Sequence, residues 1–107
     1  MATYLVQVSY SAQGTAAMIK KPQDRAAAVR PVIERMGGKM LGFWFAFGEY
    51  DVVVIVEYPD NVSAAALAMA VGSSEGISAY RTTALLTTAE AMEAMKKAGG
   101  VSYKGPK

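Results

Sequence analysis

The residue types that this chain lacks narrow the chemistry that it can perform. Its 107 residues include no cysteine and no histidine. Without cysteine there is no disulfide, no thiolate metal site and no thiol nucleophile. Without histidine the commonest metal ligand, the usual axial ligand of haem and the usual general base near neutral pH are missing. Acid–base chemistry would therefore have to use Asp, Glu, Lys or Tyr.

Asp51 is the carboxylate whose position most suggests a site, because it follows Tyr50 directly and opens the apolar run at 52–56. Two interpretations are open. As a turn residue it would accept hydrogen bonds from the backbone of Gly48 and Glu49, since Asp beside a turn usually serves the backbone. As a general base beside Tyr50 it would need a raised pKa and a neighbouring cavity.

Three further side chains are candidates for contacts with a ligand. Tyr10, together with Tyr4 and Tyr80, would either line a pocket between a sheet and its helices or lie at its rim. Trp44, on an apolar strand, packs in a core or interface or else offers a platform for a ligand. Arg81 interrupts a strand of small and apolar residues, so it pairs with a buried carboxylate, binds an anionic ligand or is solvated. The predicted ligand-binding set is Tyr10, Trp44, Tyr50, Asp51 and Arg81.

The elements that would position these residues follow from periodicity and turn chemistry. Residues 3–10 alternate and predict a first strand. Turn residues at 11–14 and one short helical turn at 15–20 precede a longer helix that ends at two glycines. Its apolar stripe, at i, i+3, i+4 and i+7, consists of Val29, Val32, Ile33 and Met36. Because Pro31 removes a backbone donor, we expect a kink or break near Ala27.

A hairpin and a second helix come next. Residues 39–47 and 52–58 predict neighbouring strands, and Gly48 between them is expected to take a positive φ that alanine would strain. Pro59 and Asp60 stop the strand and cap a helix that runs to Gly72. The apolar residues that recur in this helix at helical spacing are Val62, Ala66, Met69 and Ala70.

The last third of the chain predicts a strand, a helix and a tail. Residues 76–86 are strand-like, and Thr87 with Glu90 forms a capping box for a final helix ending at Gly99 and Gly100. We expect this helix to turn its methionines, Met92 and Met95, inward. The expected domain covers residues 1–98, and residues 99–107 form a flexible tail.

The predicted order, β-α-β-β-α-β, is an α+β ferredoxin-like sandwich, with four antiparallel strands, two helices on one face and an extra C-terminal helix. Its other face should be polar in a monomer, yet residues 40–47 and 52–56 are apolar on both sides. In the second strand Met40 and Trp44 are expected on one face, and Phe43 on the other. A second copy is the expected cover, because a symmetric dimer needs only one self-complementary patch.

The second helix has no charged residue from 62 to 74. This composition predicts further subunit contacts or, alternatively, an alanine-rich face in solvent.

Gly48, Tyr50 and Asp51 form a Gly-x-Tyr-Asp signature between an aromatic strand and an apolar strand. With Gly37–Gly38 before the second strand and Pro59–Asp60 before the second helix, the sequence resembles the GYD-domain family of small bacterial proteins over residues 3–95. The resemblance implies a dimeric α/β-barrel type of fold, in which two sheets pack face to face. Relatives in that superfamily include cofactor-free monooxygenases, isomerases, haem-degrading enzymes and ligand-sensing domains. This chain departs from the haem and histidine-dependent branches because it has no histidine.

Two classes of function therefore remain. The first is a homo-oligomeric small-molecule-binding or assembly domain, which we favour, and the second is a cofactor-free oxygenase or isomerase acting on a small aromatic or lactone substrate. We expect neither cofactor nor metal. The net charge of +2 is too small and dispersed for a nucleic-acid partner. No apolar run has the length of a membrane span and no signal peptide is recognisable, so a soluble cytoplasmic protein is expected.

Overall fold

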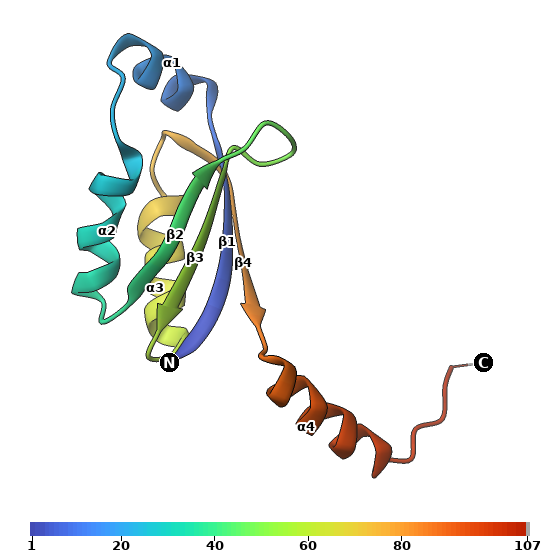
Figure 1. Ribbon diagram of the computed structural model, residues 1–107. Coiled ribbons are helices and arrows are strands. Elements are labelled where there is room, and N and C mark those ends of the chain that lie inside the picture. Colours follow the sequence, from blue (N-terminus) through green and yellow to red (C-terminus); the bar gives the residue numbers. More distant parts are fainter. Residues whose placement is uncertain (107) are drawn as a thin grey trace.

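A four-stranded antiparallel sheet forms the centre of the computed structural model, which describes residues 1–106 (Figure 1). Its strands are β1 (Ala2–Tyr10), β2 (Lys39–Phe45), β3 (Val52–Tyr58) and β4 (Ile77–Leu85), in the spatial order β2-β3-β1-β4. The central pair is therefore β1 and β3, and the β2–β3 hairpin lies at one side of the sheet. The α+β ferredoxin-like arrangement is confirmed.

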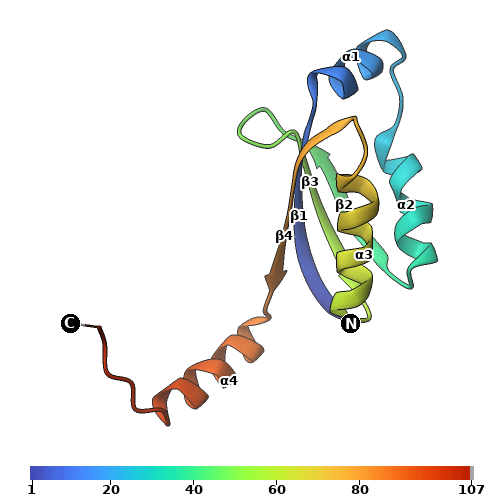
Figure 2. The ribbon, with the colours of Figure 1, turned by 180° about the vertical axis from the view of Figure 1, so that it is seen from behind.

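Two helices cover one face of this sheet. α2 (Arg25–Arg35) lies against β2, and α3 (Asn61–Gly72) lies against β4. α1 (Ala12–Lys20) stands beyond one end of the sheet, and α4 (Thr88–Gly99) leaves it at the other end (Figures 1 and 2). The face opposite α2 and α3, called the open face below, is covered by no element of residues 1–106.

The core lies between the sheet and these two helices. β1 and β3 alternate strictly, so every second side chain is buried on the helix side. Ile33 of α2 and Leu67 of α3 pack against them. The buried strand residues are Tyr4, Val6, Val8, Val52, Val54, Val56 and Tyr58.

A bulge in β2 changes which of its residues face the helices. Met40 and Gly42 pair with consecutive residues of β3, so Leu41 is the extra residue. The sequence pattern predicted that Met40 and Trp44 share a face, and the bulge separates them. Met40 is buried beside Phe43, whereas Trp44 lies on the open face.

The first two helices differ in detail from the pattern-based expectation. The side chain of Ser11 accepts a hydrogen bond from the Gly14 N–H at 3.0 Å, so α1 begins at Ala12 and not after a turn. α2 continues through Pro31 without a break. The bond that proline removes would have used the carbonyl of Ala27, and both residues are exposed, so water can satisfy that carbonyl.

α3 begins as expected, because the Asp60 side chain accepts a hydrogen bond from the Ser63 N–H at 2.8 Å. The face that it buries differs from the expected one. Ala64 and Leu67 are buried, whereas Val62 and Met69 are exposed. A helix that is apolar on every side offers no periodicity from which its buried face can be chosen.

α4 has the predicted capping box between Thr87 and Glu90, and it ends at Gly99. Its methionines do not point inward, because the helix touches almost nothing else in the chain and Met92 is 56% and Met95 69% exposed. Residues 101–106 have no regular structure, and Lys107, the last residue of the expected tail, lies outside the described residues. Among the helices of residues 1–106, none combines the length and apolarity that crossing a membrane requires.

Candidate functional site

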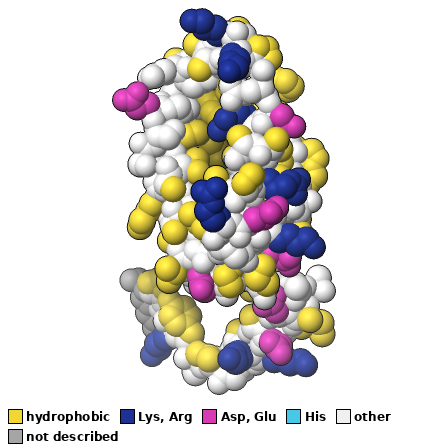
Figure 3. Space-filling model, turned by 90° about the vertical axis from the view of Figure 1, so that its left-hand side faces the viewer, with side chains coloured by type: hydrophobic (Ala, Val, Ile, Leu, Met, Phe, Trp, Pro, Cys, Tyr) yellow, Lys and Arg dark blue, Asp and Glu magenta, His cyan; other side chains and the backbone are white. Residues whose placement is uncertain are grey.

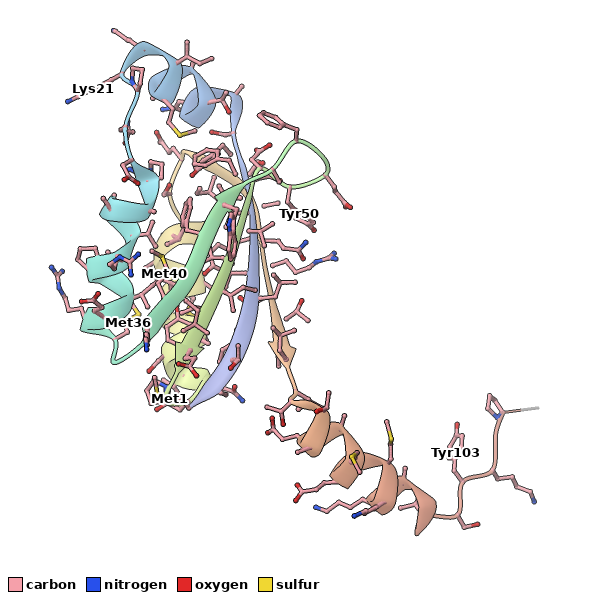
Figure 4. The ribbon with its side chains drawn as sticks, viewed as in Figure 1. Met1, Lys21, Met36, Met40, Tyr50 and Tyr103 are labelled. Carbon is pink, nitrogen blue, oxygen red and sulfur yellow. The ribbon has the colours of Figure 1, made fainter. Side chains whose placement is uncertain are left out.

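The predicted ligand-binding residues do not gather in one place, because the sheet separates them. Tyr10 packs on the helix side with the core. Trp44 and Arg81 lie on the open face, and Tyr50 extends from the β2–β3 loop on that same side (Figure 4). Asp51 stands between the two groups, at the end of β3.

Asp51 serves the backbone. Its Oδ2 accepts a hydrogen bond from the Tyr10 N–H at 2.9 Å, and its own N–H donates to the Val8 carbonyl at 2.9 Å. The β1–β3 pairing ends at Val52, so the Tyr10 N–H points past the end of β3, where the carboxylate replaces the next carbonyl. The turn interpretation predicted this kind of role but placed the donor at Gly48 or Glu49. The donor is on β1 because β3 has β1 as well as β2 for a neighbour.

Gly48 does not need to be glycine for conformational reasons. Gly37, at the end of α2, has φ of 79° and is the one residue of 1–106 with a positive φ. A Cβ added to Gly48 would meet no atom within 4 Å. The expectation of a positive φ at Gly48 is wrong, because the loop at 46–51 is longer than the two-residue turn that imposes one.

On the open face, one row of side chains crosses the sheet from edge to edge. The register aligns Trp44 with Val53, Val53 with Gln7, and Gln7 with Arg81. Trp44 and Arg81 therefore stand three strand spacings apart, about 14 Å. The Arg81 guanidinium lies 5.7 Å from the ring centre of Tyr50, a cation–π contact on an exposed surface. A shallow hollow of about 330 Å³ beside them is lined by Gln7, Ala46, Phe47, Gly48, Glu49, Tyr50, Val53 and Arg81.

Trp44 lies along its own strand. A Cβ on Gly42 would overlap its indole ring, so the ring covers the space that this glycine leaves. The indole is nevertheless 57% exposed, because nothing in residues 1–106 covers the open face above it. A large half-exposed aromatic ring held flat on an apolar sheet is typical of an interface.

On the helix side, the space between α2 and α3 is incompletely filled. A cavity of about 50 Å³ lies there against β1 and β3. Its polar groups come from Tyr10, Tyr80 and Arg25, and the remaining wall is apolar. Figure 3, which views the molecule from the helix side, shows a hollow floored by hydrophobic side chains with a basic side chain at its edge. The apolar lining is Val6, Val8, Val29, Ile33, Phe43, Val52, Val54, Val56, Leu67, Val71 and Ile77.

A second cavity, of about 160 Å³, lies beneath α1. It shares Tyr10, Arg25 and Ile77 with the first, so these three side chains border both spaces. α1 is held over it by the α3–β4 loop. The Ser11 hydroxyl donates to the Glu75 carbonyl at 2.7 Å, and the Ser11 N–H donates to the Gly76 carbonyl at 2.9 Å.

The electrostatics of this double cavity favour a hydrogen-bond donor role for its polar groups. Burial raises the pKa of Tyr10 more than the neighbouring Arg25 guanidinium lowers it, and burial raises the pKa of Tyr80 well above its ordinary value. Both phenols therefore remain protonated at neutral pH. Arg25 donates to Gln23 Oε1 at 2.8 Å, which leaves most of its five N–H donors free for a ligand at the junction of the cavities.

A comparison with protein families identifies the family of this chain. A family model described as the GYD domain matches residues 4–95. The chain belongs to the GYD-domain family. In this GYD domain the signature residues Gly48, Tyr50 and Asp51 lie in the loop that connects β2 to β3. The comparison with curated proteins found no match.

Sequence reasoning missed Arg25 as a site residue of this GYD domain. In the sequence Arg25 stands near Lys20 and Lys21 around Pro22, a cluster of charges that is typical of a solvated face. The half-buried position of Arg25 arises because Asp24 caps α2 and sets its first residue over the cavity, with the Ala27 N–H 3.1 Å from Asp24 Oδ1. Lys21 lies away from the sheet, in the connection between α1 and α2 (Figure 4). No cluster of metal-binding side chains occurs in residues 1–106 of the GYD domain.

Proposed function

We propose that this GYD domain is a homo-oligomeric small-molecule-binding domain whose ligand occupies the adjacent cavities between the sheet and α1, α2 and α3. The observation that carries the binding role is the unfilled space in the core, with apolar walls and three convergent polar side chains. A domain used for assembly alone would be expected to fill its core to ordinary packing density.

The dimensions and chemistry of the cavities point to a small ligand with an apolar body and an anionic group. Volumes of about 50 and 160 Å³ lie below the range of about 300–1,000 Å³ that holds drug-sized ligands, so a molecule with a single ring is the appropriate size. Its ring would contact the valine-rich wall of the first cavity. Its anionic group would bind Arg25, with the Tyr10 hydroxyl as a second donor.

The lining favours binding over catalysis. No carboxylate occurs among the residues that line the two cavities. Tyr10 and Tyr80 hold their protons at neutral pH, so neither phenol is a general base there. Asp51 already accepts the Tyr10 N–H. A cofactor-free oxygenase or isomerase would need a base in contact with its substrate, and this arrangement supplies donors instead.

The homo-oligomeric part of the proposal rests on the open face. Its central side chains, Leu5, Val53 and Ile55, are apolar and only half-buried, and Trp44 lies beside them. A contiguous apolar sheet face is costly to leave in water, at roughly 25 cal/mol per Å². A second copy presents the same face, so two sheets packed face to face would cover both.

Benzoate and its neutral analogue benzamide test the binding role. We expect benzoate to raise the melting temperature and to shift the NMR signals of Tyr10 and Tyr80, and benzamide to do so much more weakly, because only the carboxylate pairs with Arg25. Arg25→Gln should remove this preference. Arg30→Gln, which neutralises an exposed arginine of the same helix, is the matched control and should keep it. Absence of any shift at millimolar benzoate, or an undiminished preference in Arg25→Gln, would contradict the proposal.

A further inference from the structure

The position of α4 is unusual for a helix of a small domain. A compact chain of 107 residues has a radius of gyration of about 13 Å. The observed radius is 17.1 Å, and the molecule extends over 57 × 36 × 22 Å. The excess comes from α4 and the segment after it, which carries Tyr103 far from the sheet (Figure 4).

α4 has an apolar side that its own chain does not cover. Met92 and Met95 lie three residues apart on one side of the helix, and Leu86 precedes it, all exposed. Glu93 and Lys97, one turn apart, lie on the opposite side. A 12-residue helix without packing partners is marginal in water, and the capping box supports only its first turn. α4 therefore requires a surface to pack on.

The direction of α4 indicates which surface this is. Beyond the end of β4, α4 turns toward the side of the open face, away from α2 and α3 (Figures 1 and 2). A second copy that covers the open face would lie beside it. The β2–β3 loop is at the other end of the sheet, so α4 cannot reach the loop of its own chain (Figure 1).

The largest exposed apolar side chains outside α4 and the tail belong to this same hairpin. We define the hairpin aromatics as Trp44 and Phe47; Trp44 lies on the open face and is about half-exposed, and Phe47, in the β2–β3 loop, is fully exposed. Phe45 pairs with Val52 and stacks on Tyr10, so it lies on the helix side and is not part of this set. Flexible methionine side chains pack favourably against aromatic rings. When two sheets face each other with their strands running in opposite directions, the hairpin of one copy lies at the α4 end of the other.

We propose that α4 is an exchanged arm, which docks on a second copy of the chain with Met92 and Met95 against the partner's hairpin aromatics. Two-fold symmetry makes the contact twice, once for each arm. The inference rests on the homo-oligomer proposed above, and it adds that the open face alone does not complete the interface.

Sedimentation of the full chain tests the arm. We expect Met92→Gln with Met95→Gln to weaken dimerisation on the order of tenfold or more, because each substitution removes a buried apolar side chain while keeping helix propensity. Glu93→Gln with Lys97→Gln is the control on the opposite side of α4, with the same net charge as the wild type, and it should dimerise like the wild type. Equal dimerisation of all three chains would overturn the proposal that α4 docks on the second copy, and it would remain compatible with a dimer formed through the open face. A monomeric wild-type chain would overturn both.

A disulfide tests where the arm docks. The chain has no cysteine, so Phe47→Cys with Met95→Cys introduces the only thiols, and chains carrying either substitution alone control for disulfides between identical positions of the two copies. Under oxidation we expect a covalent dimer on a non-reducing gel, and none when Met95→Cys is replaced by Glu93→Cys on the opposite side of the helix. Cross-linking that is equally weak for both pairs would overturn the assignment of the hairpin aromatics as the docking surface.

Discussion

Tyr4 and Tyr58, on neighbouring strands, are both buried, but their hydroxyl groups differ. The Tyr4 hydroxyl donates to Asn61 Oδ1, whereas the Tyr58 hydroxyl has no hydrogen-bond partner within residues 1–106. We predict that Tyr58→Phe leaves the free energy of unfolding at pH 7 unchanged or raises it by up to about 1 kcal/mol, and that Tyr4→Phe lowers it by about 1 kcal/mol. Urea unfolding of both variants measures the difference, and an equal loss in both would contradict it.

Tyr58 also makes the stability of the domain depend on pH in the alkaline range. Burial raises the pKa of Tyr58 from 10.0 to about 12. Between these values the unfolded chain loses the phenol proton while the folded chain keeps it, so the unfolded state binds fewer protons and stability falls as pH rises. We expect the free energy of unfolding to decline through this window, and less steeply in Tyr58→Phe. Parallel curves for the variant and the wild type would show that Tyr58 does not cause the decline.

A second test on a single residue concerns Asp51, because its carboxylate accepts a hydrogen bond from the Tyr10 N–H. Asp51→Asn keeps an acceptor, so we expect a nearly unchanged melting temperature, whereas Asp51→Ala should cost about 1–2 kcal/mol. Thermal unfolding of the two variants separates these effects. If both variants melted like the wild type but lost benzoate binding, Asp51 would belong to a ligand site and its backbone role would be secondary.

At the scale of elements, local signals and distant neighbours explain different parts of the fold. The strand at 3–10, the Asp60 cap and the Thr87–Glu90 capping box were predictable, because each depends on residues a few positions apart. The bulge at Leu41 was not, because it appears only in pairing with β3. The buried side of α3 also depends on its neighbours, since that helix is apolar all round.

The candidate site, like the fold, could be predicted from the sequence only in part. Sequence reasoning placed Tyr10 in a pocket or at its rim, but it joined Tyr10 to Trp44 and Arg81, which lie on the other face of the sheet. Nothing in the linear pattern shows which side of an apolar strand faces the helices. Arg25 reaches the cavity only through the placement of α2, so its charge alone resembled that of a solvated residue.

α1 provides a prediction for a whole element. A Cβ on Gly14 would overlap the carbonyl oxygen of Gly76, so Gly14→Ala must push α1 away from the α3–β4 loop. Because α1 buries no side chain, we expect its amides to exchange faster and benzoate binding to weaken, with little change in the melting temperature of the domain. Hydrogen exchange measures this, with Gly48→Ala, which meets no neighbouring atom, as the control. Unchanged exchange at residues 12–20 would show that the loop adapts instead.

For the whole molecule, the main question is what covers the open face. A substitution of Ile55, at the centre of that face, tests it. Ile55 pairs with Leu5 on one side and Gly42 on the other. In a monomer the lysine side chain introduced by Ile55→Lys would project into water, and the substitution would change the free energy of unfolding little. In a face-to-face dimer each copy would bury an unpaired charge, which costs several kcal/mol.

We therefore predict that the wild type is a dimer, or a multiple of one, in native mass spectrometry at micromolar concentration. Ile55→Lys should weaken the dimer by about a hundredfold or more while circular dichroism remains that of a folded domain. Ala28→Lys adds the same charge to the exposed side of α2 and should leave the assembly intact. The single tryptophan, Trp44, gives an independent signal, since its emission should shift to the red when the dimer dissociates. A dimer that survives Ile55→Lys unchanged would place the interface elsewhere, and α4 would then need a different partner surface from the one assigned to it.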